Sequence, residues 1–384
     1  MTRADLLVVG GGPAGSTLAA LAASRGARVV VLEKETFPRD KVCGEFVSAE
    51  GCAVLDRLGL LPALRSAGAV PMTACLLADA RGRFATADLP LLPEVGREAL
   101  GISRQVMDAA LLQLAAGRGA VVHERVSALA PIVDGGRVCG VTTRSGPYRA
   151  PLVVAADGRR SMLQRALHPR AGDPLRTTSR SWFGLKAHFP DTTGGLSGRI
   201  ELFVFDGGYA GLGPIEGGRL NLALIATVRA LRACGGSPDR LLRERMLANP
   251  LLADRLGGSA PCSAWKTVGP LRFGARRPTS HGVLFVGDAA GTIDPFSGEG
   301  MSHALAGAEL ALPYVLSGGL SREGERAWDR AWRKAFAPVT RRVRLVGRVF
   351  EHTRPASWAM SVLSSAAGGR ALPRLVAATR TGAL

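Results

Sequence analysis

The chain has 384 residues, 47% of them hydrophobic, and 49 glycines, which suits a folded α/β protein with a large core and two domains and excludes a disordered chain. Its 49 basic and 31 acidic residues give a formal charge of +18. The six cysteines show neither CxxC nor zinc spacing, so we expect reduced thiols, no metal site and a cytoplasmic location. The first predicted strand begins within the first residues, which leaves no room for a signal peptide, and no apolar run is long enough to span a membrane.

The first predicted elements are a strand at residues 6–9, a glycine-rich turn, a helix, and a second strand at residues 29–32. Gly10 permits the tight turn, Gly12 lets the backbone approach a pyrophosphate, and Gly15 lets the helix pack against the sheet. Glu33 follows the second strand, where it can accept from ribose hydroxyls and would repel a 2′-phosphate. The pattern predicts FAD or NAD bound by these residues: Gly10, Gly12, Pro13, Ala14, Gly15 and Glu33.

Two later segments also end a predicted buried strand with an acid and a glycine. Residues 152–161 contain Asp157 and Gly158, and residues 283–291 contain Gly287 and Asp288. Ligands of open α/β sheets bind at the carboxyl ends of strands, where such acids can accept from ribityl hydroxyls. A helix predicted from about residue 302 to 316 would point its positive end at a flavin pyrimidine.

In this order, the three segments resemble the signatures of the FAD-dependent aromatic hydroxylase and geranylgeranyl reductase superfamily. The resemblance extends to about residue 320 and implies FAD as cofactor and NADPH or NADH as electron donor. It also implies that Arg104, ahead of an apolar helix at residues 106–116, lies near the pyrophosphate. One departure is Gln164, where the superfamily usually has arginine. The further predicted cofactor-binding residues are Lys34, Arg39, Cys43, Gly44, Arg104, Val126, Asp157, Gly158, Gly287, Asp288, Pro295, Gly298, Gly300 and Met301.

The predicted fold is α/β, α+β overall, with a Rossmann-like FAD-binding domain, an interleaved antiparallel substrate sheet and C-terminal helices. The FAD-binding domain is assigned to residues 1–75, 98–175 and 271–318. The substrate domain is assigned to residues 76–97, a hairpin with its turn at Arg81-Gly82, and to residues 176–270, where polar and apolar residues alternate. Residues 319–384 form the predicted helical tail.

The residues that could face the substrate are fewer. Cys43-Gly44-Glu45, preceded by a lysine, resembles a segment of the prenyl reductases, so Cys43 could face the flavin or only fill a tight turn. Tyr209 and Pro214 match a motif of those reductases and of flavin halogenases, but the large motif positions are Gly211 and Gly213. The glycines open room for a bulky substrate or mark a bulge. Cys43, Tyr209 and His188 are the candidate catalytic residues.

Basic residues gather in the tail, from Arg322 to Arg354, and alternate with apolar ones. Trp328, Trp332 and Phe336 recur every four residues on one helix face, which usually packs on the parent domain. The basic flanks suggest a peripheral contact with the inner face of the membrane, or guidance of a lipophilic substrate. Nucleic acid is not an expected partner, because no binding motif accompanies the charge.

The sequence leaves three functions open. The favoured hypothesis is an NAD(P)H-driven monooxygenase that uses O₂ to hydroxylate a bulky lipophilic aromatic or polyketide-like secondary metabolite. The alternative is a geranylgeranyl-reductase-like enzyme that saturates C=C bonds of a prenyl lipid. The third is a non-catalytic flavin-bearing assembly or carrier-binding protein, which the cofactor signatures at both ends of the flavin disfavour.

Overall fold

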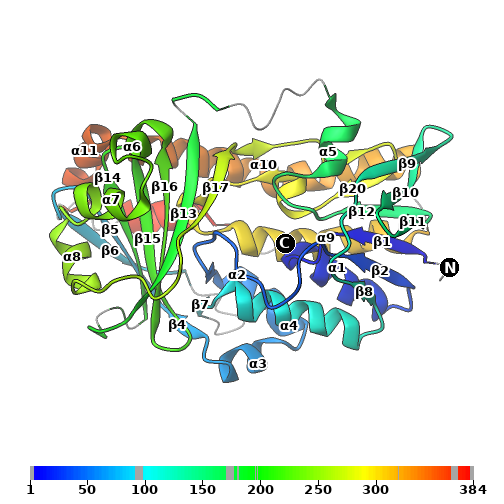
Figure 1. The fold of residues 1–384 in the computed structure, drawn as a ribbon, viewed down its shortest axis with the longest axis horizontal. Helices are drawn as coiled ribbons and strands as arrows, with labels where there is room; N and C mark the ends of the chain where they lie inside the picture. Colours follow the sequence, from blue (N-terminus) through cyan, green and yellow to red (C-terminus); the bar gives the residue numbers. More distant parts are fainter. Residues whose placement is uncertain are drawn as a thin grey trace.

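The computed structural model describes residues 4–90, 98–169, 177–179, 181–194, 196, 198–318, 320–364 and 371–380. Parts of the predicted domain segments, at residues 91–97 and 170–176, lie outside the described residues. The predicted α/β class is confirmed: a mostly parallel sheet and a larger mixed sheet stand side by side, with helices packed on both (Figure 1). None of the described helices is both long and apolar enough to cross a membrane.

The six-stranded sheet forms one half of the molecule, which is called the dinucleotide-binding half because the sequence predicts dinucleotide binding there. Its order is β19 (Thr279–Ser280), β20 (Val283–Phe285), β12 (Leu152–Ala155), β1 (Leu6–Val9), β2 (Val29–Leu32) and β8 (Val121–His123). All neighbours are parallel except β19 and β20. All four residues of β1, β2 and β12 are buried, as expected for parallel strands covered on both faces. Helices α1 (Pro13–Ala23), α4 (Arg104–Gly117) and α9 (Gly300–Leu316) pack around this sheet.

Glycines permit the close approach of α1 to the sheet. Gly10 has a φ of +107°, and a Cβ there would lie 2.4 Å from the carbonyl oxygen of Ala156. A Cβ on Gly15 would lie 1.9 Å from the carbonyl oxygen of Gly10. Real Cβ atoms do not come this close, so both positions require glycine, as the motif predicts.

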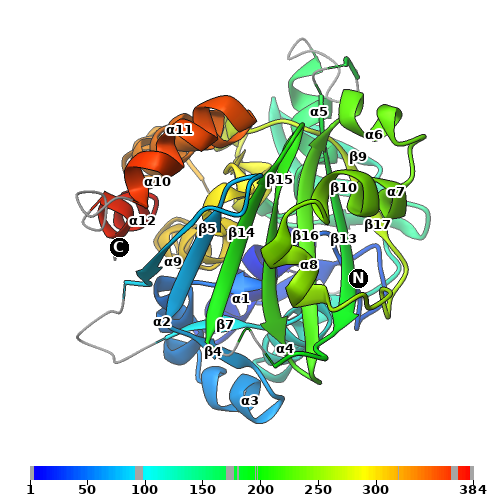
Figure 2. The same cartoon turned by 90° about the vertical axis from the view of Figure 1, so that its left-hand side faces the viewer.

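The seven-stranded sheet forms the other half. Its order is β17 (Lys266–Leu271), β13 (Trp182–Pro190), β16 (Arg219–Thr227), β15 (Gly208–Ile215), β14 (Arg199–Phe205), β5 (Ala74–Ala78) and β6 (Phe84–Asp88). Its pairs are antiparallel apart from β14 and β5. Figure 2 shows α6 (Val228–Ala233), α7 (Pro238–Leu241) and α8 (Pro250–Leu256) across its outer face. The other face turns toward the dinucleotide-binding half.

Smaller elements complete the fold. Small sheets comprise β3 (Phe46–Val47), β7 (Ala99–Gly101) and β4 (Val70–Met72); β11 (Gly146–Arg149), β10 (Arg137–Thr143) and β9 (Ala130–Asp134); and β18 (Gly274–Ala275) with β21 (Gly291–Thr292). Short helices are α2 (Ala49–Arg57), α3 (Leu61–Ser66), α5 (Met162–Leu167) and the π-helical turn Leu242–Met246, with 3₁₀ turns at Gly287–Ala289 and Pro295–Ser297.

The described part of the predicted tail contains three helices: α10 (Arg322–Phe350), α11 (Thr353–Leu363) and α12 (Ala371–Ala378). Trp328, Trp332 and Phe336 are all buried on the dinucleotide-binding half, and the indole of Trp328 donates to the carbonyl oxygen of Pro278 at 2.7 Å. The aromatic face of the tail therefore packs on the protein, and its basic residues lie on the remaining surface.

Candidate functional site

The N-terminus of α1 forms the first wall of the site. Its N-cap, Gly12, has no side chain and Pro13 has no N–H, so the N–H groups of Ala14 and Gly15 are the first free ones and have no side-chain cap; Gly12, Pro13 and Ala14 line the pocket. Glu33 is buried directly after β2, and its Oε2 accepts from the backbone N–H of Gly11 at 2.8 Å. Its Oε1 accepts from Glu35 N at 2.9 Å. A carboxylate has about four acceptor positions, so two remain for ribose hydroxyls.

Replacing Glu33 by Ala is expected to weaken FAD binding by at least tenfold, because the loss removes a charged acceptor worth about 1.5–3 kcal/mol and frees the Gly11 turn. Glu35→Ala is the matched control, since Glu35 is exposed and only approaches Lys34 at 3.9 Å. Fluorescence titration of the apoprotein with FAD measures both. Equal dissociation constants for the two variants would contradict the assignment of Glu33 to the adenosine end.

A pair of arginines on one carboxylate lies beside this turn. Asp108 is fully buried and accepts from Arg39 at 2.9 Å and from Arg104 at 2.7 and 2.6 Å. Two guanidinium groups on one acid leave a net positive charge next to Gly12, whose Cβ would lie 3.6 Å from Arg39 Nη2. The buried Nε of Arg39 has no partner among the described residues. An uncapped helix end and an unpaired guanidinium donor fit the diphosphate of FAD.

Lys41, which the sequence reasoning did not assign to the cofactor, also points into the site, with its Nζ 3.9 Å from the place of a Gly158 Cβ. Reduced solvation, with the positive charges of Arg39 and Arg104, lowers the pKa of this ammonium to about 8. The protonated form attracts a diphosphate and the neutral form does not.

FAD affinity is therefore expected to be constant below pH 7 and to fall as the pH rises through about 8, where Lys41 loses its proton. A bound diphosphate favours the charged form of Lys41, so the pKa of Lys41 should be higher in the complex. The affinity should therefore fall between about pH 8 and this higher pKa. Lys41→Arg should retain affinity to higher pH, since arginine stays protonated. Dissociation constants measured from pH 6 to 10 test this, and an unchanged profile in the variant would exclude Lys41 as the titrating group.

The flavin end is formed by the other two signatures. Asp157 Oδ2 accepts from the backbone N–H of Met162 at 2.7 Å, while Oδ1 is buried without a partner in the described part of the chain. Burial raises the pKa of Asp157. Asp288 is partly exposed to the pocket and lies 4.0 Å from Arg159. The helix α9 begins at Gly300 with no side-chain cap and faces the same pocket. These groups fit a ribityl chain and flavin ring.

Gln164, the departure from the superfamily pattern, has a structural explanation. Its Nε2 donates to the carbonyl oxygens of Arg277 at 2.6 Å and Ala289 at 3.0 Å. Ala289 directly follows Asp288, so the glutamine ties the second signature to the third. The glutamine therefore joins the segment of Asp157 to the segment of Asp288 by direct hydrogen bonds.

A recess of about 440 Å³ runs from these groups to the seven-stranded sheet. Of the predicted cofactor residues, Gly12, Pro13, Ala14, Lys34, Cys43, Gly44, Arg104, Asp157, Gly158, Gly287, Asp288, Pro295, Gly298, Gly300 and Met301 line it. The others, Gly10, Gly15, Glu33, Arg39 and Val126, are not among its lining residues; Val126 N donates to Glu33 O at 2.9 Å. The substrate side is mainly apolar, with Leu77, Leu89, Ile200, Leu202, Ile225, Phe296, Leu375 and Val376.

The three candidate catalytic residues differ in their placement. Cys43 lines the recess. Tyr209 also lines it, but its hydroxyl donates to Asp294 at 2.5 Å, and burial together with that carboxylate raises its pKa well above 10. Tyr209 therefore stays neutral and offers its ring to the recess. His188 is not among the lining residues; its Nε2 bonds to Glu45 Oε2 at 2.7 Å. His188 therefore does not face the recess, contrary to the expectation that it contacts the substrate.

His188 belongs to a buried polar network that holds the segment of residues 40–45, the Cys43 loop. Glu45 Oε1 accepts from Lys186 Nζ at 2.6 Å and from the backbone N–H of Arg104 at 2.7 Å. Lys186 also pairs with Asp40. A further bond joins Asn221 Nδ2 to the carbonyl oxygen of Cys43 at 3.0 Å. Sequence reasoning did not assign this network, because Lys186 lies 141 positions from Glu45.

Arg380, beyond α12, was not predicted either. It is buried at the recess, pairs with the equally buried Glu299, and lies over the ring of Phe46 at 5.1 Å. Glu299 precedes α9, so the ion pair attaches the end of the chain to the flavin end of the site. Within the described residues, no group of His, Cys, Asp and Glu is arranged to hold a metal ion.

Comparisons with known proteins agree with this geometry. Residues 3–312 match the family described as FAD binding domain. Menaquinone reductase of Mycolicibacterium smegmatis is 27% identical over 90% of this chain and 85% of its own length. Digeranylgeranylglycerophospholipid reductase of Methanothrix thermoacetophila is 30% identical over 87% and 84%. A geranylgeranyl bacteriochlorophyll reductase-like structure from Thermoplasma acidophilum shares the fold, with a TM-score of 0.77 and 21% identity over 98% and 95%.

Proposed function

This chain belongs to the FAD-binding domain family and is an FAD-dependent oxidoreductase; from that premise we propose that it saturates C=C bonds of a lipophilic, prenyl-type substrate, with NADPH or NADH as electron donor. FAD, when bound and reduced, supplies a hydride for such a bond. The remaining requirements fall to the protein: an apolar chamber, exclusion of water and a fixed substrate position.

The observation that carries this proposal is the fixed position of the Cys43 loop. Lys186, Glu45 and His188 are each no more than 2% exposed, and together they hold the loop against the substrate sheet. Burying three charged or titratable groups is costly unless they are paired and hydrogen-bonded, as these are. The arrangement sets Cys43 at the boundary between the cofactor residues and the apolar lining. Relatives named menaquinone reductase and digeranylgeranylglycerophospholipid reductase support a reduction as the proposed reaction.

Hydroxylation of a bulky aromatic or polyketide-like substrate is the second candidate. It is favoured by Gly211, which lines the recess with only the carbonyl oxygen of Ala223, at 3.9 Å, near the place of its Cβ. That open space admits fused rings. Gly213 does not contribute to it, because the place of its Cβ is filled by Met72 and Ile200.

Incubation of the FAD-loaded protein with NADPH or NADH and either polyprenyl lipids or lipophilic phenols, in air and under argon, separates the candidates. A product that gains hydrogen and still forms under argon supports the reductase. A product that gains oxygen, with matching O₂ consumption, supports the hydroxylase and overturns the first proposal. Bound flavin that turns over neither substrate class would favour the non-catalytic assembly or carrier-binding function.

A further inference from the structure

Helix α10 has a buried aromatic face and an opposite basic face. At 1.5 Å per residue, its 29 residues extend for about 43 Å. The buried face contains Trp328, Trp332, Phe336, Val339, Val343 and Phe350. At 100° per residue, the opposite face carries a stripe of exposed cations along its length, which we call the basic face: Arg326, Arg330, Arg333, Lys334, Arg341 and Arg348.

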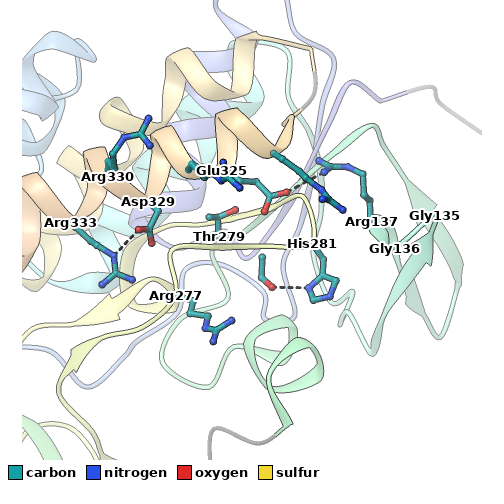
Figure 3. A pocket seen from close by; sticks show the side chains of 13 residues that line it. Gly135, Gly136, Arg137, Arg277, Thr279, His281, Glu325, Asp329, Arg330 and Arg333 are labelled. Atoms are coloured by element: carbon teal, nitrogen blue, oxygen red, sulfur yellow. Dashed lines mark hydrogen bonds and ion pairs between the residues drawn. The ribbon is translucent and has the colours of Figure 1, made fainter.

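The first half of the basic face borders a surface hollow of about 850 Å³, at the β19 edge of the six-stranded sheet (Figure 3). Six arginines and two acids line it: Arg137, Arg277, Arg322, Arg326, Arg330, Arg333, Glu325 and Asp329. Glu325 pairs with Arg137 at 3.2 Å and Asp329 with Arg333 at 2.8 Å. The other four arginines form no ion pair with an acid in the described part of the chain, so the hollow has an uncompensated positive charge that suits a phosphate.

The second half of the tail adds exposed apolar side chains to the arginines. Leu345 of α10 is 68% exposed and Trp358 of α11 is 73% exposed. Trp358 shares one face of α11 with exposed Arg354 and Val362, four residues on either side. Tryptophan and leucine beside arginine are typical of helices that lie in a membrane interface, where the apolar parts enter the lipid and the cations meet phosphates.

This surface adjoins the substrate side of the recess. Leu372, Leu375 and Val376 of α12 line the recess, and α11 packs on β6 and β14 of the substrate sheet. Figures 1 and 2 show α11 following α10 along the same edge of the molecule. A lipophilic molecule leaving a lipid layer at α11 would therefore meet the helices that close the chamber.

We propose that the basic face of α10 and the exposed face of α11 form a docking surface for an anionic lipid bilayer, from which the substrate enters beside α12; the proposal rests on the lipophilic substrate proposed above. An acidic protein or a nucleic acid would match the arginines but would leave Trp358 and Leu345 without a role. A bilayer matches both the phosphate-binding cations and the apolar side chains.

Sedimentation with vesicles tests the docking surface without substrate or nucleotide. The FAD-loaded protein should sediment with vesicles containing phosphatidylglycerol, sediment far less with phosphatidylcholine alone, and dissociate as salt is raised. Arg326→Glu with Arg330→Glu should weaken binding by about tenfold or more. Trp358→Ala should weaken it at high salt as well, because its contribution is apolar. The control, Arg25→Glu with Arg65→Glu, makes the same change of net charge in the α1–β2 turn and in α3, which lies at the edge opposite α10 (Figure 1).

Three outcomes would overturn the proposal: no preference for anionic vesicles, full binding by the Arg326/Arg330 variant, or an equal loss in the Arg25/Arg65 control, which would mean attraction by net charge alone. Turnover of detergent-dispersed substrate keeps the two proposals apart. It should be unchanged in the Arg326/Arg330 variant, whereas failure of turnover in the unaltered protein, with vesicle binding intact, would count against the proposed reaction and not against docking.

Discussion

Glu45→Ala is expected to lower the free energy of unfolding by about 3–5 kcal/mol, because it leaves Lys186 buried with one carboxylate instead of two and removes the partner of His188. It also frees the backbone N–H of Arg104 and the Cys43 loop. Glu45 itself has a φ of +53°, a conformation that costs energy in a non-glycine residue and that its side-chain contacts hold in place. Urea denaturation followed by circular dichroism measures the change.

Glu309→Ala is the matched control for this measurement, since it breaks a carboxylate–arginine pair with exposed Arg57 and should cost less than about 1 kcal/mol. Lys186→Met combined with Glu45→Gln and Asp40→Asn should recover part of the loss, because no carboxylate or ammonium of the network is then left buried without its partner. A destabilisation by Glu45→Ala no larger than that of Glu309→Ala would show that the buried network does not hold the loop.

Gly211→Trp is expected to abolish turnover of a bulky substrate while FAD remains bound. The indole adds roughly 150–250 Å² of side-chain surface at a position of the recess wall where glycine has no side chain. Gly211→Ala should leave turnover within about twofold, because the place of its Cβ is open. Steady-state kinetics, with flavin absorbance to follow cofactor content, test both. Unchanged kinetics in Gly211→Trp would place the substrate elsewhere, and loss of flavin would mean that the strand, rather than the substrate space, was disturbed.

The cofactor half could be predicted from the sequence because its signals are local. A strand, a glycine turn and an acid occupy consecutive positions, and the structure has β1, α1, β2 and Glu33 in that order. The family and the fold class are confirmed. Helix bounds shifted slightly, with α9 beginning at Gly300 and α4 at Arg104, because their first turns contain residues without apolar periodicity.

The substrate half was less predictable because its contacts join distant residues. The alternation in β13 made His188 a candidate for contact with the substrate, yet His188 and Lys186 are buried against the Cys43 loop. The alternation identified the strand but not what covers its second face. The placement of α12 on the recess was likewise not foreseen, since a short apolar segment at the end of a basic tail does not indicate which surface it covers.

The order of strands in the six-stranded sheet has a consequence for biosynthesis. β12 lies between β1 and β20, so this sheet is incomplete until residue 285 has left the ribosome, whereas the neighbouring strands β13 to β16 are made within residues 182–227. Pairings of low sequence separation form sooner than long-range parallel ones. The hairpins of the substrate sheet are therefore expected to pair during synthesis before β20 completes the six-stranded sheet, whose first strands, β1 and β2, are made much earlier.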